Sequence, residues 1–210
     1  MRTDYKLNSK DKLTALINHS GIETWNELME FTKNLSYGRN SNRTDLGLVI
    51  KEKKGTCSSK HAFLKKVADL NKIKNIKLIL GIYRMNQRNT PKIGNELSEN
   101  SIEYIPEAHC YLKIDNERTD ITTHQADFDR IEMDIIEVHE IMHEQVAEFK
   151  VDYHKQFLRK WISENQIEKD FDEIWEIREK YIINLTEKPT HNTVSYEKHQ
   201  SRSSNIVFIF

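Results

Sequence analysis

The spacing of apolar positions predicts helices in the first part of the chain. Leu13, Leu16 and Ile17 fall on one face of a helix that covers about residues 9–19. Thr24 can cap a second helix, whose apolar positions begin at Trp25. We therefore expect the chain to open with two short amphipathic helices.

A polar interruption and a third helix follow. The stretch "LSYGRNSNRTD" (35–45) breaks the periodicity and predicts an ordered loop. The next stretch, "LGLVIKE" (46–52), is apolar and β-branched, which predicts a short strand or an extended lead-in. Gly55 permits a tight entry into a helix that runs from Cys57 to about Asn71. A single cysteine is thus expected at the start of a helix.

The middle of the chain has the pattern of an antiparallel sheet. "IKLILGIYRM" (76–85) is apolar and bounded by polar residues, which predicts a buried strand. Residues 108–122 predict a hairpin that turns at 115–116, where an Asp-Asn pair stands. "MDIIEVHEIM" (133–142) predicts another strand, whereas 90–100 is expected to be irregular.

The last third of the chain predicts a helical hairpin packed on the sheet. Two apolar series step by three or four residues. They are Val146, Phe149, Tyr153, Phe157 and Trp161, then Phe171, Ile174, Trp175, Arg178, Ile182 and Leu185. We expect an α+β fold, with a core over residues 1–142 and a helical extension over 143–210 packed on it in one compact domain. The terminal "NIVFIF" could add an edge strand or cover a groove.

Composition narrows the class of protein. The chain has 210 residues, of which 37% are hydrophobic and 31% charged, with three prolines and six glycines. This indicates a globular protein without long linkers. The net charge of −1 gives no basic field for nucleic acid. No apolar run approaches the ~18 residues of a membrane span.

Cysteine usage and the N-terminus predict a location. Two cysteines, Cys57 and Cys110, are too few for a disulfide framework. The opening "MRTDYKLNSKDK" lacks the apolar core of a signal peptide. We therefore expect a cytoplasmic protein, in which a lone cysteine is reduced and is either catalytic or inert.

Cys57 stands where a helix favours a nucleophile. The first turn of a helix has free N–H groups and a positive dipole end, which lower the pKa of a thiol. The same N–H groups can hold an oxyanion that forms when the thiolate attacks a carbonyl. The alternative is a small capping or core residue.

The predicted hairpin supplies a base and a carboxylate. With an even turn, His109, Tyr111, Asp120 and Thr122 share one face of the two strands. His109 and Asp120 then lie diagonally, roughly 7–8 Å apart in backbone, which the two side chains can bridge. Cys110 points to the other face and is expected in the core.

Two other histidines compete for the role of base. His61 lies one helical turn after Cys57 on the same helix face, and His124 follows the second strand of the hairpin. A neighbour on the same helix points along the surface, whereas His109 faces across a cleft. His109 is therefore the preferred base.

The segments "GTCSSKHAFLKKVA", "EAHCYLKI" and "RTDITT" together resemble the transglutaminase-like superfamily of cysteine enzymes. The resemblance covers roughly residues 53–123. It implies a papain/transglutaminase-like core, in which a nucleophile helix packs on an antiparallel sheet. Cys57 would be the nucleophile, His109 the base and Asp120 its orienter. Thr119 stands where many members have a tryptophan.

The resemblance also implies the chemistry. A thioester acyl-enzyme would form on Cys57 from the amide or ester carbonyl of a peptide or small molecule. The acyl group would then pass to water or to an amine, so the enzyme would be a hydrolase or an acyltransferase. This chemistry requires no cofactor, and the sequence leaves the substrate and the oligomeric state open.

The polar loop is the expected substrate-binding segment. Tyr37, Arg39 and Asn40 supply hydrogen-bond donors upstream of the cysteine. Arg39 or Arg43 could hold a substrate carboxylate by a bidentate contact. The alternative is a plain surface loop.

Two other functions compete with cysteine chemistry. "HEIMH" (139–143) matches the zinc motif in which His139 and His143 are ligands and Glu140 is the base. That motif requires a helix, and the pattern here is that of a strand, so no metal site is expected. The other possibility is a non-catalytic module that binds a partner through its C-terminal helices.

Overall fold

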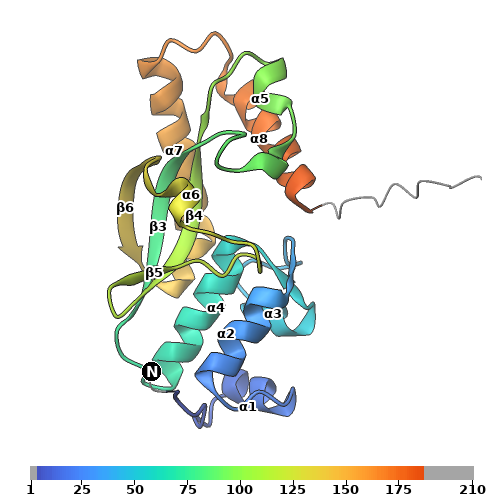
Figure 1. The fold of residues 1–210 in the computed structure, drawn as a ribbon, viewed down its shortest axis with the longest axis vertical. Helices are drawn as coiled ribbons and strands as arrows, with labels where there is room; N and C mark the ends of the chain where they lie inside the picture. The colour runs from blue at the N-terminus through green and yellow to red at the C-terminus, as the bar shows by residue number, and fades with distance from the viewer. Residues whose placement is uncertain (1–3, 187–210) are drawn as a thin grey trace, which may run out of the picture.

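The computed structural model describes residues 4–186 and has a mixed α+β fold (Figure 1). Its main sheet is antiparallel, with the strand order β5-β4-β3-β6. These strands are β3 (Ile76–Met85), β4 (Ile105–Ile114), β5 (Glu117–Thr119) and β6 (Ile135–Ile141). The strands predicted over 76–85, 108–122 and 133–142 are confirmed.

Helices lie at both ends of this sheet (Figure 1). One end carries α1 (Lys12–His19), α2 (Trp25–Asn34), α3 (Leu48–Lys51) and α4 (Cys57–Leu70). Helix α6 (Asp129–Glu132) lies against the strands, and α7 (Glu148–Glu164) runs alongside them toward the other end, where α5 (Glu96–Glu99) and α8 (Phe171–Thr186) lie. Smaller elements are β1 (Ser36–Tyr37), β2 (Lys54–Gly55) and the 3-10 helices η1 (Pro91–Ile93) and η2 (His143–Val146). Among residues 4–186, no helix is both long and apolar enough to cross a membrane.

The hairpin between β4 and β5 turns where the sequence predicts. Asp115 and Asn116 have φ values of 48° and 71°, the left-handed region that tight two-residue turns require. Asx residues tolerate this region better than most others. Leu112 pairs with Thr119 across the turn, so the residues that follow β5 return alongside β4.

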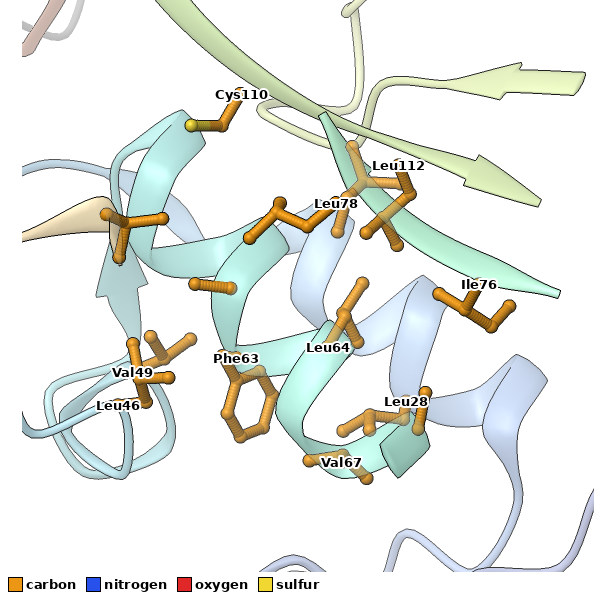
Figure 2. Close-up of a cluster of buried hydrophobic side chains, with 14 of the residues drawn as sticks. Leu28, Leu46, Val49, Phe63, Leu64, Val67, Ile76, Leu78, Cys110 and Leu112 are labelled. Atoms are coloured by element: carbon orange, nitrogen blue, oxygen red, sulfur yellow. The ribbon is translucent and has the colours of Figure 1, made fainter. Parts of the chain in front are cut away.

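The first hydrophobic core lies between α4 and one face of the sheet (Figure 2). Phe63 and Leu64 of α4 are fully buried, as are Leu78 of β3 and Leu112 of β4. Cys110 belongs to the same cluster and is also fully buried, so its assignment to the core is confirmed. Helix α4 is thereby fixed on the sheet along its length.

The second core lies on the opposite face and includes the C-terminal helices. Side chains of β3 and β4, such as Tyr83 and Tyr111, cluster with Trp161 of α7 and with Ile174 and Tyr181 of α8. The predicted helical hairpin is confirmed over its described part. Its tail, including "NIVFIF", lies outside the described residues.

The buried stripe of α7 differs from the expected one. Phe149 is 44% exposed, whereas Lys150 and His154 on the neighbouring positions are buried with Leu158 and Trp161. The prediction was wrong here because it followed apolar residues only. Cavities and hydrogen-bond partners accommodate the two polar side chains on the inner face.

Two loop predictions were also wrong. Residues 46–52 were expected to be extended, yet α3 is helical. Asp45 starts this turn, since its Oδ1 accepts a hydrogen bond from Gly47 N–H at 2.9 Å, while Val49 and Ile50 are buried. The stretch 90–100 was expected to be irregular but contains η1 and α5. Local turn chemistry outweighs residue propensity in such short segments.

Candidate active site

Cys57 is the first residue of α4, as predicted, and its side chain is buried. The preceding Thr56 caps the helix: its hydroxyl accepts from Ser59 N–H at 3.4 Å, and Ser59 Oγ accepts from Thr56 N–H at 2.9 Å. The cap leaves the first-turn N–H groups of Cys57 and Ser58 without an intrahelical acceptor. Free N–H groups at a helix start can bind a negatively charged oxygen beside the sulfur.

The upstream loop lies beside the cysteine because of a short parallel strand pair. β1 pairs with β2, and Tyr37 stands opposite Gly55. A Cβ on Gly55 would lie 2.8 Å from Lys60 Cγ and 2.9 Å from Ser59 Oγ, so only glycine fits there. This close approach brings Tyr37 next to the start of α4.

His109 and Asp120 are in direct contact. His109 Nε2 lies 2.8 Å from Asp120 Oδ2, with both side chains largely buried. Asp120 Oδ1 accepts hydrogen bonds from Thr122 N–H at 2.8 Å and from Thr122 Oγ1 at 2.6 Å, which fixes the carboxylate. Because Asp120 occupies Nε2, Nδ1 is the ring nitrogen left for the thiol of Cys57. The structure thus brings the three predicted residues together.

The charges of this group favour an ion pair between sulfur and imidazole. Burial opposes ionisation of Cys57, but the positive charges of Lys150 and His109 outweigh it and lower the pKa of the thiol to about 6. Burial also disfavours the charged form of His109, but Asp120 and the thiolate raise the pKa of its ring to about 10. Near neutral pH the site therefore holds a thiolate and an imidazolium.

His61 has a different role from the one considered for it. Its Nδ1 lies 2.7 Å from the carbonyl oxygen of Cys57, and its Nε2 accepts from Ile121 N–H at 2.9 Å. Both nitrogens are occupied, and burial lowers the pKa of the ring to about 4, so it stays neutral. His61 therefore positions the start of α4 against the segment after Asp120. The other competitor, His124, is exposed.

Lys60 links the start of α4 and the segment after Asp120 to the C-terminal end of α2. This fully buried side chain donates from Nζ to the carbonyl oxygens of Leu35 at 2.7 Å and Thr122 at 2.8 Å. A buried ammonium is tolerated only with such partners. The backbone around Asp120 is thus fixed from two sides, by His61 and by Lys60.

Two cavities meet at Cys57. The first, called here the basic cavity, has a volume of about 90 Å³ and lies toward α7. Its charged and polar lining includes Tyr37, Arg39, Arg43, Glu107, Lys150 and Arg178. The second, called the histidine cavity, has a volume of about 220 Å³. Its lining includes His109, Asp120, Tyr83, Met85, Ile131 and Ile182.

The residues expected to bind substrate lie in different settings. Tyr37 lines both cavities. Arg39 forms a two-point ion pair with Glu179, with N–O distances of 2.8 and 2.9 Å. Asn40 Nδ2 donates to the carbonyl oxygen of Lys54 at 3.0 Å and so holds the loop together. Tyr37 is therefore the member of the three that is free to meet a ligand.

The zinc-type motif does not adopt the geometry that its chemistry needs. His139 and Glu140 lie on β6, and His143 follows in η2, so no helix aligns the two histidines. His139 Nε2 lies 2.8 Å from Tyr153 Oη, and Glu140 accepts from Lys77 at 2.7 Å. Within residues 4–186 no three His, Cys, Asp or Glu side chains are placed to hold a metal ion.

Sequence reasoning missed two groups near the sulfur. Lys150 lines the basic cavity and lowers the pKa of Cys57, and Glu107 is buried beside it in an ion pair with Arg178. A usable signal existed for Lys150, because it follows Val146 by four residues on the inner stripe of α7. The partner of Glu107 lies far along the chain, and nothing in its spacing indicates the pair.

Comparison of the chain with protein-family models, with curated proteins and with solved structures finds no match in any of the three. The assignment of a function to this site therefore depends on its geometry and its charges.

Proposed function

We propose that this protein is a cysteine-dependent acyl enzyme of the transglutaminase-like type, acting as an amide or ester hydrolase or as an acyltransferase. The observation that carries the proposal is the 2.8 Å contact between His109 and Asp120, made beside a low-pKa thiol at a helix N-terminus. A nucleophile, a base and an orienter in this order form a proton-handling triad. The two unpaired cysteines support a reducing compartment such as the cytoplasm.

The geometry supports a two-step mechanism. The Cys57 thiolate attacks the carbonyl carbon, and the N–H groups of Cys57 and Ser58 stabilise the oxyanion. The His109 imidazolium gives its Nδ1 proton to the leaving group as the carbon–heteroatom bond breaks, which leaves a thioester on Cys57. His109 then takes a proton from water or an amine, which attacks the thioester and releases the product. Asp120 holds the ring in the required tautomer throughout.

A non-catalytic binding module is the competing reading. Nothing in such a module would require a buried thiol with a pKa of about 6 beside a histidine held by a carboxylate. Perturbed titration of this kind is typical of a reacting group. We therefore favour the enzyme.

The test is acyl transfer from an activated ester to one named sulfur. We expect 4-nitrophenyl acetate to give a single acetyl adduct on Cys57, seen by intact mass and peptide mapping. Cys57→Ala should abolish the adduct and ester turnover, and His109→Ala should slow turnover by about 10²–10⁴-fold, because it removes the charge that ionises the thiol and the group that transfers protons in both steps. Cys110→Ala is the matched control and should acylate normally. Turnover that persists in folded Cys57→Ala would refute the proposal.

A further inference from the structure

Two cations that line the basic cavity make no hydrogen bond or ion pair with residues 4–186. Arg178 forms a bidentate pair with Glu107, with N–O distances of 2.7 and 3.0 Å, and Arg39 pairs with Glu179. The remaining cations in the lining are Lys150 and Arg43. His154 lines the cavity as well, but burial lowers the pKa of its ring to about 4, so it adds no charge at neutral pH.

Of these two cations, Lys150 gives the stronger evidence for a ligand site. Its side chain is nine-tenths buried and lines the cavity, yet within residues 4–186 it makes no hydrogen bond or ion pair. Lys150 lies close enough to Cys57 and Glu107 to lower the pKa of both groups, but its ammonium makes no hydrogen bond or ion pair with either of them. A buried charge without a partner is costly, so the cavity favours an anionic group from a ligand.

The two cavities divide the substrate between them. His109 must touch the leaving group to protonate it, and His109 lines only the histidine cavity. The leaving group, and later the attacking water or amine, therefore occupy the histidine cavity. The acyl part then lies on the other side of the sulfur, in the basic cavity.

We propose that the acyl group of the substrate carries a carboxylate, which Lys150 and Arg43 bind while the hydroxyl of Tyr37 donates a further hydrogen bond. Among residues 4–186 neither Arg43 nor the Tyr37 hydroxyl makes a hydrogen bond or an ion pair, so both can bind a ligand. The basic cavity, at about 90 Å³, is the smaller of the two cavities, which suits a short chain. The substrate class is thus the monoamides, esters or thioesters of short dicarboxylic acids. This inference rests on the function proposed above.

The first test compares two alkylating reagents of nearly equal shape. Iodoacetate and iodoacetamide both add a two-carbon group to the thiolate, but only iodoacetate carries a carboxylate. We expect Cys57 to react faster with iodoacetate, whereas free glutathione measured in parallel should prefer iodoacetamide. The ratio of the two rate constants does not depend on the fraction of thiolate, so it reports the binding of the anion alone.

Variants assign the preference to named side chains. Lys150→Gln and Arg43→Gln should each lower the iodoacetate-to-iodoacetamide ratio by about tenfold, the loss of one charge-assisted hydrogen bond. Lys160→Gln, which removes an exposed charge from the same helix, should leave the ratio unchanged. A reactive Cys57 without preference for iodoacetate, or a ratio unaltered in both variants, would overturn the inference and spare the proposed function. An unreactive Cys57 would overturn both.

The second test uses acyl donors. We expect the phenyl thioester of glutaric acid to acylate Cys57 with at least about tenfold higher kcat/KM than that of pentanoic acid, and Lys150→Gln to remove the difference. Equal rates for the two donors, despite a preference for iodoacetate, would refute the placement of the acyl part in the basic cavity.

Discussion

At the scale of single residues, the reactivity of Cys57 is set by its neighbours more than by the thiol. Burial alone would keep the sulfur protonated, and the cations Lys150 and His109 reverse that preference. Cys110 shows the contrast: burial raises the pKa of its thiol to about 12, because Lys150 lowers it too little and His109 does not act on it. Two adjacent positions, one on α4 and one on β4, thus hold a reactive and an inert cysteine.

The pH dependence of alkylation follows from these values. The thiolate is the reacting form, so the rate of Cys57 alkylation by iodoacetamide should rise through pH 6 and level off above it. His109→Gln removes a positive charge and should move the midpoint to higher pH. Stopped-flow alkylation with mass detection measures both. A midpoint near the ~8.5 of free cysteine in the unmodified protein would contradict the ion pair.

The triad was accessible from the sequence, and its supporting residues were not. Cys57, His109 and Asp120 have recognisable positions: a helix start and two places on one hairpin face. His61 was visible only as a helix neighbour, because its partners are the backbone groups of Cys57 and Ile121. A hydrogen bond to the backbone of a distant residue places no constraint on the type of that residue, so it leaves no pattern in the sequence and can be found only in the structure.

At the scale of elements, the entry into α4 decides where the sulfur lies. Three features fix this entry within a few residues of Cys57: the cap formed by Thr56, the close packing at Gly55, and the pairing of β1 with β2. Sequence reasoning predicted this helix start because Gly55 precedes a helical pattern, but it did not use the Thr56 cap. It missed α3, since one turn stabilised by Asp45 leaves too short a period to detect.

A single methyl group should disturb this entry. We expect Gly55→Ala to lower the free energy of unfolding by about 1–3 kcal/mol, because its Cβ would overlap Lys60 Cγ and Ser59 Oγ. Gly38→Ala is the matched control, since its Cβ would meet Lys54 Cδ at an ordinary 3.5 Å. Urea unfolding gives the energies, and the alkylation rate of Cys57 reports displacement of the sulfur. Equal effects of the two substitutions would contradict the steric argument.

At the scale of the whole molecule, a buried charge cluster joins the C-terminal helix to the sheet. Glu107 of β4 accepts from Arg178 and, at 2.6 Å, from the hydroxyl of Tyr181, both on α8. Burial alone would raise the pKa of this carboxyl, but Arg178 holds it well below its usual range. The ion pair between Glu107 and Arg178 therefore joins α8 to the central sheet next to the basic cavity.

Breaking this link should destabilise the fold. Arg178→Met leaves Glu107 buried and unpaired, and we expect a loss of about 3–5 kcal/mol in urea unfolding. The double variant with Glu107→Gln should recover part of the loss, and Lys180→Met, on the exposed face of α8, should change stability by less than about 0.5 kcal/mol.

The same link has a pH signature. The folded pKa of Glu107 is depressed, so its contribution to stability is present above the ordinary carboxyl value of 4.5 and is lost as pH falls below it. The Glu107→Gln/Arg178→Met protein should lose less stability on acidification than the unmodified protein. An equal loss would show that Glu107 does not carry this dependence.

The individual strands, the hairpin over 108–122 and the C-terminal helices were also within reach of the sequence, whereas the pairing of β3 with β6 was not. Periods of two and of three to four residues distinguish strands from helices, and the Asp-Asn turn sets the hairpin. The face that α7 presents was not predictable from apolar residues, because Lys150 and His154 occupy inner positions. The position of a polar residue in a core is determined by its function and its interaction partners, and hydropathy does not predict it.

The imidazole of His61 bridges the two pieces of chain that deliver the sulfur and the acid. One ring nitrogen lies within hydrogen-bond distance of the carbonyl oxygen of Cys57, and the other accepts a hydrogen bond from the backbone N–H of the residue directly after Asp120. This one ring therefore links the backbone of Cys57 to the backbone next to Asp120, so the relative position of the thiol and the carboxylate depends on a neutral side chain that takes no part in the proposed chemistry.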